Sequence, residues 1–193
     1  MTPKRPIWTV TPIGNGGVRL IEPPVFADAR GSFMETWSER TFRTFGIEDH
    51  FVQDNQSVSV LPYTLRGIHF QRPPTAQAKL VRCLFGRIRD VVVDLRPESK
   101  DFLVPHVVEL SGDAPTMLYI PKGFGHGFVT LEEQTVVAYK TDAFYAPQSE
   151  GAILWNDASL AVPWGLPEGV SPILSEKDRV APPLAVFLAD LKR

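Results

Sequence analysis

Short runs of apolar residues, broken by turn residues, recur along the whole chain. The runs are rich in Val, Ile, Phe and Thr, and 18 prolines and 14 glycines punctuate them. This pattern is typical of many brief antiparallel strands joined by turns. We predict strands over residues 31–37, 51–60, 65–71, 79–85, 87–94, 105–110, 117–120, 127–131 and 135–141.

Two helices are predicted beside these strands. Ser38 is a suitable N-cap for a short helix that ends near Phe45. Near the C-terminus, apolar residues follow Pro182 and Pro183 at the i, i+3, i+4, i+7 spacing of one helix face. They are Leu184, Phe187, Leu188 and Leu191. We therefore predict an amphipathic helix over about residues 182–192.

The predicted elements favour a mainly β fold in one domain. A chain of 193 residues can bury most of its apolar surface around one core. Repeats, charge blocks and low-complexity linkers that would divide residues 1–193 are not found. Closing many short strands into a barrel or jelly roll removes exposed strand edges, and its interior can hold a small ligand.

Composition narrows the choice of partners and location. The formal net charge of −2 gives no attraction toward polyanions, so nucleic acid is not an expected partner. Residues 1–10 lack the apolar core of a signal peptide, and no stretch approaches the roughly 20 apolar residues of a membrane span. We expect a cytoplasmic protein with no membrane partner. Cys83 is the single cysteine, which excludes an intrachain disulfide, and its apolar neighbours favour packing.

Polar residues are densest on two predicted strands, in segments 65–71 and 77–82. Because side chains alternate along a strand, His69 shares a face with Gly67 and Gln71, and Lys79 shares one with Val81. Both His69 and Lys79 could therefore point into a barrel. A hydrogen-bonded core histidine and a solvated lysine would give the same spacing. Alternation alone leaves both interpretations open.

A metal site is the main competitor for these residues, because imidazole is a common metal ligand. Ligands are scarce, since the chain has four histidines and Gln71 stands where a second imidazole of a His-x-His pair would lie. We predict no metal. His126 lies in a glycine-rich segment, residues 121–128, which could equally be a tight turn with an exposed imidazole.

Taken together, the motifs resemble those of the dTDP-4-dehydrorhamnose 3,5-epimerase family of sugar-nucleotide epimerases. The matching segments follow in order along most of the chain. They are residues 28–31 with Phe33 and Glu35, then 53–55, 65–71, 77–82, 90–96, 120–128, 139–140, Glu150, 155–157 and 174–178. The resemblance implies a cupin-type jelly-roll barrel without a metal or redox cofactor. It also implies a homodimer in which N-terminal strands pack on the partner subunit.

The resemblance assigns catalytic roles to four residues. His69 is the general base that removes a proton next to a ketone, and Asp178 is the carboxylate paired with it. Lys79 is placed at the enolate oxygen, and Tyr139 is the acid that delivers a proton to the opposite ring face. From the residues alone, Asp178 could be a helix cap, and Tyr139 could be a core aromatic.

Binding roles follow from the same resemblance. Arg30, Arg66 and Lys177 match positions that contact the nucleotide diphosphate, for which guanidinium groups are suited donors. Further matches to substrate-binding positions are Glu35, Gln53, Asp54, Asn55, His126, Tyr145 and Glu150, and Phe33 could stack on a base ring. Simple alternation puts Arg66 and His69 on opposite faces. Placing both near one substrate requires a β-bulge or a substrate at the barrel mouth.

One departure from the family pattern precedes the base motif. Leu61-Pro62-Tyr63-Thr64 replaces the expected glycine and valine, which puts in doubt the nucleotide accepted more than the proton chemistry.

We predict epimerisation at C3 and C5 of dTDP-4-keto-6-deoxy-D-glucose, which gives the dTDP-L-rhamnose precursor. A C3-only or C5-only epimerase, a cupin that merely binds a sugar nucleotide, and a metal-dependent cupin are the alternatives.

Overall fold

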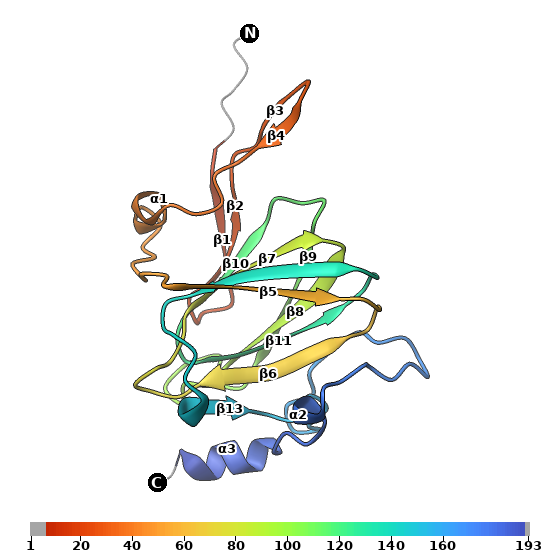
Figure 1. The fold of residues 1–193 in the computed structure, drawn as a ribbon. Coiled ribbons are helices and arrows are strands. Elements are labelled where there is room, and N and C mark those ends of the chain that lie inside the picture. Colours follow the sequence, from red (N-terminus) through yellow and green to blue (C-terminus); the bar gives the residue numbers. More distant parts are fainter. Residues whose placement is uncertain (1–6, 192–193) are drawn as a thin grey trace.

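The computed structural model describes residues 7–191 of the chain, which are mostly β (Figure 1). The strands are β1 (Thr9–Ile13), β2 (Val18–Glu22), β3 (Phe26–Asp28), β4 (Gly31–Phe33), β5 (Gln53–Ser59), β6 (Leu65–Gln71), β7 (Lys79–Phe85), β8 (Arg87–Asp94), β9 (Pro105–Ser111), β10 (Met117–Ile120), β11 (Phe124–Thr130), β12 (Thr135–Thr141) and β13 (Glu150–Ala152). The helices are α1 (Glu39–Arg43), α2 (Glu176–Arg179) and α3 (Leu184–Asp190).

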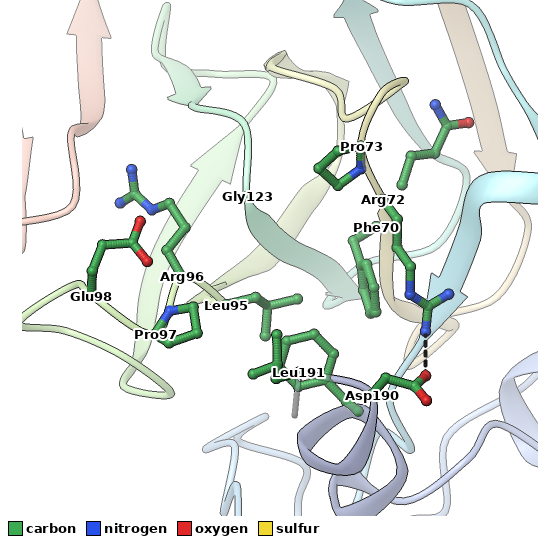
Figure 2. Close-up of a pocket in the computed structure, with 12 residues that line it drawn as sticks. Phe70, Arg72, Pro73, Leu95, Arg96, Pro97, Glu98, Gly123, Asp190 and Leu191 are labelled. Atoms are coloured by element: carbon green, nitrogen blue, oxygen red, sulfur yellow. Dashed lines mark hydrogen bonds and ion pairs between the residues drawn. The ribbon is translucent and has the colours of Figure 1, made fainter. Parts of the chain in front are cut away.

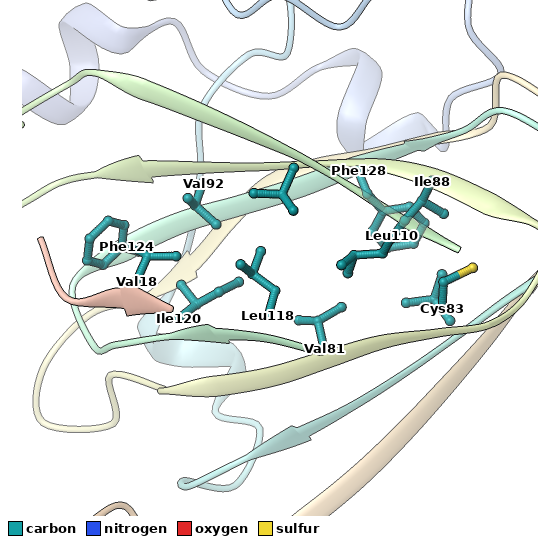
Figure 3. Packing of buried hydrophobic residues seen from close by; sticks show 12 residues of the cluster. Val18, Val81, Cys83, Ile88, Val92, Leu110, Leu118, Ile120, Phe124 and Phe128 are labelled. Atoms are coloured by element: carbon teal, nitrogen blue, oxygen red, sulfur yellow. The ribbon is translucent and has the colours of Figure 1, made fainter. Parts of the chain in front are cut away.

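Two antiparallel sheets form the body of the molecule. One has the order β1-β2-β10-β7-β12-β5, and the other has the order β13-β6-β11-β8-β9. Their facing sides enclose an apolar core to which both sheets contribute, for example Val81 from β7, Val92 from β8 and Phe128 from β11 (Figure 3). Figure 1 shows the sheets as two layers, with the β3–β4 hairpin projecting beyond them. The mainly β prediction is therefore confirmed.

Each sheet also buries its outer face. The C-terminal part of the chain packs Trp164, Leu184 and Phe187 against residues of β6 and β8. Aromatic residues around α1, including Phe42, pack on Leu80 and neighbouring residues of the six-stranded sheet. These outer layers pack against the sheets, and strands position side chains more precisely than loops do.

Most predicted strands are present with accurate limits. Strands β6, β7, β8, β10 and β12 begin and end at the predicted residues, and Gly86 forms the tight β7–β8 turn with a φ of +74°. The predicted strand 31–37 is shorter, because the chain leaves the sheet after Phe33. Strands β1, β2, β3 and β13 and helix α2 were not predicted, since they are short and lack a clear apolar period.

Both predicted helices are present in shorter form. Ser38 is the N-cap of α1, and its hydroxyl accepts a hydrogen bond from the backbone N–H of Thr41. Helix α3 covers Leu184–Asp190, and residue 192, the predicted helix end, lies outside the described residues.

No helix in the described part of the chain is long and apolar enough to cross a membrane. Cys83 is buried in the core, and burial raises the pKa of its thiol to about 11, which agrees with a packing role.

Candidate active site

A bulge in β6 places Arg66 and His69 on the same side of the sheet. Arg66 pairs with Phe128 of β11, and His69 pairs with His126, so β6 uses three steps where β11 uses two. One extra residue in a strand reverses the alternation of side chains beyond it. Both Arg66 and His69 consequently line a cavity between the sheets. Of the two alternatives that the sequence left open, a β-bulge or a substrate at the barrel mouth, the structure contains the bulge.

His69 forms a short contact with a buried carboxylate. Its Nε2 atom lies 2.6 Å from Oδ1 of Asp178, whose side chain is only 4% exposed. The hydroxyl of Ser175 donates to Asp178 Oδ2 at 2.6 Å, and the backbone N–H of Gly67 donates to Oδ1 at 3.2 Å. Asp178 therefore has partners on both oxygens. This arrangement fixes the imidazole in one orientation.

The protonation of Asp178 follows from these contacts. Burial alone would raise its pKa, but the hydrogen bonds from His69 and Ser175 outweigh burial and hold the pKa below its usual range. Asp178 lies in α2, the short helix that Ser175 caps. The helix-cap interpretation of Asp178 is thus wrong, because Ser175 is the cap and Asp178 bonds to His69.

Lys79 and Tyr139 face the dyad from the opposite sheet. Lys79 begins β7 and Tyr139 lies in β12, two neighbouring strands of the six-stranded sheet. The cavity measures about 220 Å³, and its walls are formed by Ser57, Arg66, His69, Lys79, His126, Gly127, Phe128, Tyr139, Ser175 and Asp178. Burial lowers the pKa of Lys79 to about 8 and raises the pKa of Tyr139. Near neutral pH the cavity thus offers one ammonium donor and one protonated phenol.

His126, which lines the same cavity, belongs to a second histidine–carboxylate pair. Its Nε2 atom lies 3.0 Å and 2.9 Å from the two oxygens of Asp90, a side chain of β8 with no exposed surface. His126 lies within β11 and is 7% exposed, so the alternative of an exposed imidazole in a turn is wrong. Burial lowers the pKa of His126, which favours the neutral ring.

Five other predicted residues form a connected group. The amide of Gln53 donates to Asn55 and accepts from the backbone N–H of Tyr145. The phenol of Tyr145 donates to Glu150 at 3.0 Å, and Lys177 forms an ion pair with the same carboxylate. Lys177 precedes Asp178, and Glu150 contributes to the potential at Lys79. The group therefore lies next to the cavity.

Four predicted binding residues are not brought to this cavity within one chain. Arg30 pairs with Asp28 in the β3–β4 hairpin, and Phe33 of the same hairpin is 71% exposed. Glu35 accepts a hydrogen bond from Thr41 beside α1. Asp54 points to the other face of β5, where it pairs with Lys140 at 2.8 Å.

Sequence reasoning missed three residues of the site, Ser57, Asp90 and Ser175. Ser57 and Arg66 each carry a buried atom, Oγ and Nε respectively, without a hydrogen-bond partner in the described chain. Leaving buried polar atoms unpaired costs about 1–3 kcal/mol each. Ser57 could have been found from the period of β5, since it shares its face with Gln53 and Asn55. Atoms of this kind are suited to hydrogen-bond a polar ligand.

A larger hollow lies on the outer side of the five-stranded sheet. It measures about 600 Å³ and lies between the end of β6, the segment after β8 and α3 (Figure 2). Phe70, Leu95 and Phe187 give it apolar walls, and Arg72 donates to Asp190 at one side. The dyad, the lysine and the phenol all line the smaller cavity instead, so we assign the chemistry there. No cluster of metal-ligating side chains is found within residues 7–191.

The fold and the site define a class of protein, a jelly-roll enzyme equipped for proton transfer at a carbon next to a carbonyl group. The family model for dTDP-4-dehydrorhamnose 3,5-epimerase matches residues 14–186. The epimerase of that name from Salmonella typhimurium is 48% identical over 166 residues, which cover 86% of this chain and 89% of that protein. The chain belongs to the dTDP-4-dehydrorhamnose 3,5-epimerase family, whose members are isomerases.

Solved structures agree with this assignment. The Legionella pneumophila enzyme, solved in complex with dTDP-4-keto-L-rhamnose, has a TM-score of 0.88 at 39% identity and covers 95% of this chain and 96% of its own. A 3'-monoepimerase from Streptomyces bikiniensis, solved with dTDP-quinovose, has a TM-score of 0.84 at 32% identity and covers 94% of this chain and 90% of its own. The predicted cupin-type fold is therefore confirmed.

Proposed function

We propose that the protein epimerises C3 and C5 of dTDP-4-keto-6-deoxy-D-glucose. The observation that carries the proposal is the His69–Asp178 dyad, which faces Lys79 and Tyr139 across one cavity. A proton on a carbon next to a ketone is acidic because the carbanion spreads its charge onto oxygen. Removing and returning this proton on opposite faces inverts the carbon. The same groups serve both carbons, since C3 and C5 flank the C4 ketone.

His69 acts as the general base in this proposal. Its Nε2–H is donated to Asp178, and the other ring nitrogen, Nδ1, accepts the substrate proton. The Asp178 carboxylate stabilises the imidazolium that forms, because its Oδ1 atom lies only 2.6 Å from Nε2 of His69. The low pKa of Asp178 keeps it ionised throughout.

Lys79 and Tyr139 complete the proton transfer. The Lys79 ammonium donates to the oxygen of the enolate, a contact that strengthens as negative charge develops there. Tyr139 then delivers its phenolic proton to the opposite ring face, and its raised pKa keeps it protonated until that step. Ser57 and Arg66 supply further donors at the cavity wall. No step requires a metal, and metal independence stays a prediction.

The nucleotide diphosphate would lie toward the group of Gln53, Asn55, Tyr145, Glu150 and Lys177. This group contains several polar donors beside the dyad. We further propose a cytoplasmic homodimer in which the β3–β4 hairpin of one subunit reaches the cavity of the other. Such an exchange would bring Arg30 and Phe33 to the substrate, which explains two exposed side chains of suited chemistry.

A monofunctional epimerase is the second candidate. The structural similarity to a 3'-monoepimerase favours it, because that protein shares the fold at 32% identity. Both reactions need the same base and the same enolate donor. They differ in whether the ring can turn so that a second carbon meets His69.

Proton NMR in D2O distinguishes these functions. We would incubate metal-free protein with dTDP-4-keto-6-deoxyglucose and follow deuterium at C3 and C5 separately. The proposal expects exchange at both carbons, with a chelator present and without added metal. Exchange at one carbon would identify the monofunctional enzyme. No exchange with folded protein would mean that the substrate is different or that the barrel only binds.

A further inference from the structure

Asp90 is a buried charge that the reaction described above does not use. Its side chain has no exposed surface, and it lies in the interior face of β8 between apolar neighbours. A buried carboxylate is strongly disfavoured without compensating charge or hydrogen bonds. Within residues 7–191, its side chain bonds only to the ring nitrogen Nε2 of His126. Because burial favours neutral His126, this contact alone leaves the negative charge uncompensated.

The Lys79 ammonium is a cation that interacts electrostatically with this carboxylate. Lys79 and His126 line the same cavity, and Asp90 holds His126 from behind. We propose that Asp90 is a positioning residue of the epimerisation site, which fixes His126 against the cavity and supplies the negative charge that keeps Lys79 protonated. The proposal rests on the assignment of Lys79 as the enolate donor.

Electrostatics at Lys79 agree with this role. Burial lowers the lysine pKa to about 8, and the charge of Asp90 opposes that shift more than any other group does. Glu150 acts in the same direction from β13 but more weakly. Other titratable or charged groups that line the cavity are Arg66 and His69 of β6, His126 of β11, Tyr139 of β12 and Asp178 of α2. Without Asp90, the pKa of Lys79 would therefore lie lower still.

The variant Asp90→Asn tests this role, because asparagine keeps the shape and removes the charge. A lysine that must be protonated gives an activity that falls as pH rises through its pKa. We expect this basic limb of kcat/KM to move to lower pH in Asp90→Asn by about one pH unit or more. For a limb that moves by one pH unit, the rate at pH 8 should fall about fourfold further than at pH 6.5. An unchanged limb would overturn the proposal, because a purely structural loss lowers the rate equally at all pH values.

Asp94→Asn is the matched control. Asp94 lies four residues further along β8, is equally buried, and bonds to Arg96 outside the cavity lining. It should lower stability without moving the basic limb. His126→Gln separates the hydrogen bond from the charge, since it leaves the Asp90 side chain in place. We expect a lower rate in this variant with a limb that moves less than in Asp90→Asn, and the reverse order would contradict the proposal.

A stability measurement keeps the test valid if Asp90→Asn does not fold. Asparagine would remove the negative charge that favours the buried ammonium, so the double variant Asp90→Asn/Lys79→Met should recover stability in denaturant unfolding. Additive losses would overturn the pairing. This measurement does not depend on turnover. Full activity in Lys79→Met would instead remove the enolate-donor role and leave the Asp90–Lys79 coupling to be judged from unfolding alone.

Discussion

At the scale of single residues, a variant of Tyr139 can separate the two halves of the proposed reaction, which are proton removal and proton return. Removing a proton requires His69, whereas inversion also requires a donor on the opposite face. Tyr139→Phe removes the donor and keeps the ring. We expect deuterium exchange at C3 or C5 to persist while epimer formation falls by about 10²–10⁴-fold, since the base can return a solvent deuteron to the same face. NMR of the recovered substrate measures both quantities in one sample.

His69→Ala is the matched comparison for that experiment. It should abolish exchange and epimerisation together, while binding of the nucleotide, measured by calorimetry, changes little. Loss of exchange in Tyr139→Phe would assign the phenol to proton removal and contradict its role as the acid. The two variants therefore test the direction of proton flow rather than only the importance of each side chain.

Residue types alone could not establish most of this site. The family resemblance predicted His69, Lys79, Tyr139 and Asp178, and the structure brings all four to one cavity. Asp90 was missed because a carboxylate within an apolar strand gives no sign of its partner, which comes from the adjacent strand β11. Pairing of this kind depends on register, which a sequence does not display.

At the scale of elements, the bulge in β6 depends on Gly67. This glycine has a φ of +123°, and a Cβ atom there would lie 2.5 Å from Cα of Gly127 in β11. We expect Gly67→Ala to lower the free energy of unfolding by about 2–5 kcal/mol through backbone strain and steric overlap. Activity should fall as well, because Arg66 and His69 flank the bulge. Chemical denaturation measures the first effect.

Gly169→Ala provides the control for strain alone. Gly169 also has a positive φ, of +76°, but nothing lies within 4 Å of its added Cβ. It should cost only about 1–2 kcal/mol. An equal loss in both variants would mean that close packing of β6 on β11 contributes nothing to the bulge.

Prediction of elements was most accurate for the long central strands, whereas most of the missed elements are short. Strands β7, β8 and β12 each span seven or eight residues that include several apolar ones, and their limits agree with the predicted ones. Strand β13 has three residues and owes its place to pairing with β6. Its position beside His69 is set by tertiary contacts, which override local propensity.

At the scale of the whole molecule, the exposed β3–β4 hairpin raises the question of which cavity its residues serve. Phe26 and Phe33 pair across the hairpin, and both are more than half exposed. Exposed aromatic side chains on a projecting element are typical of an interaction surface. If the hairpin completes the partner's site, the particle in solution should have twice the 21.5 kDa mass of the chain. A monodisperse monomer in sedimentation would contradict the homodimer.

Mixed dimers test whether the hairpin acts on the partner. Arg30→Ala and His69→Ala subunits should each form weakly active or inactive homodimers. In a heterodimer, the site with intact His69 would receive Arg30 from the other subunit, so one site of two would be complete. Random reassociation of equal amounts should therefore restore about a quarter of wild-type activity. If Arg30 served its own chain, no heterodimer site would hold both groups, and mixing would restore nothing.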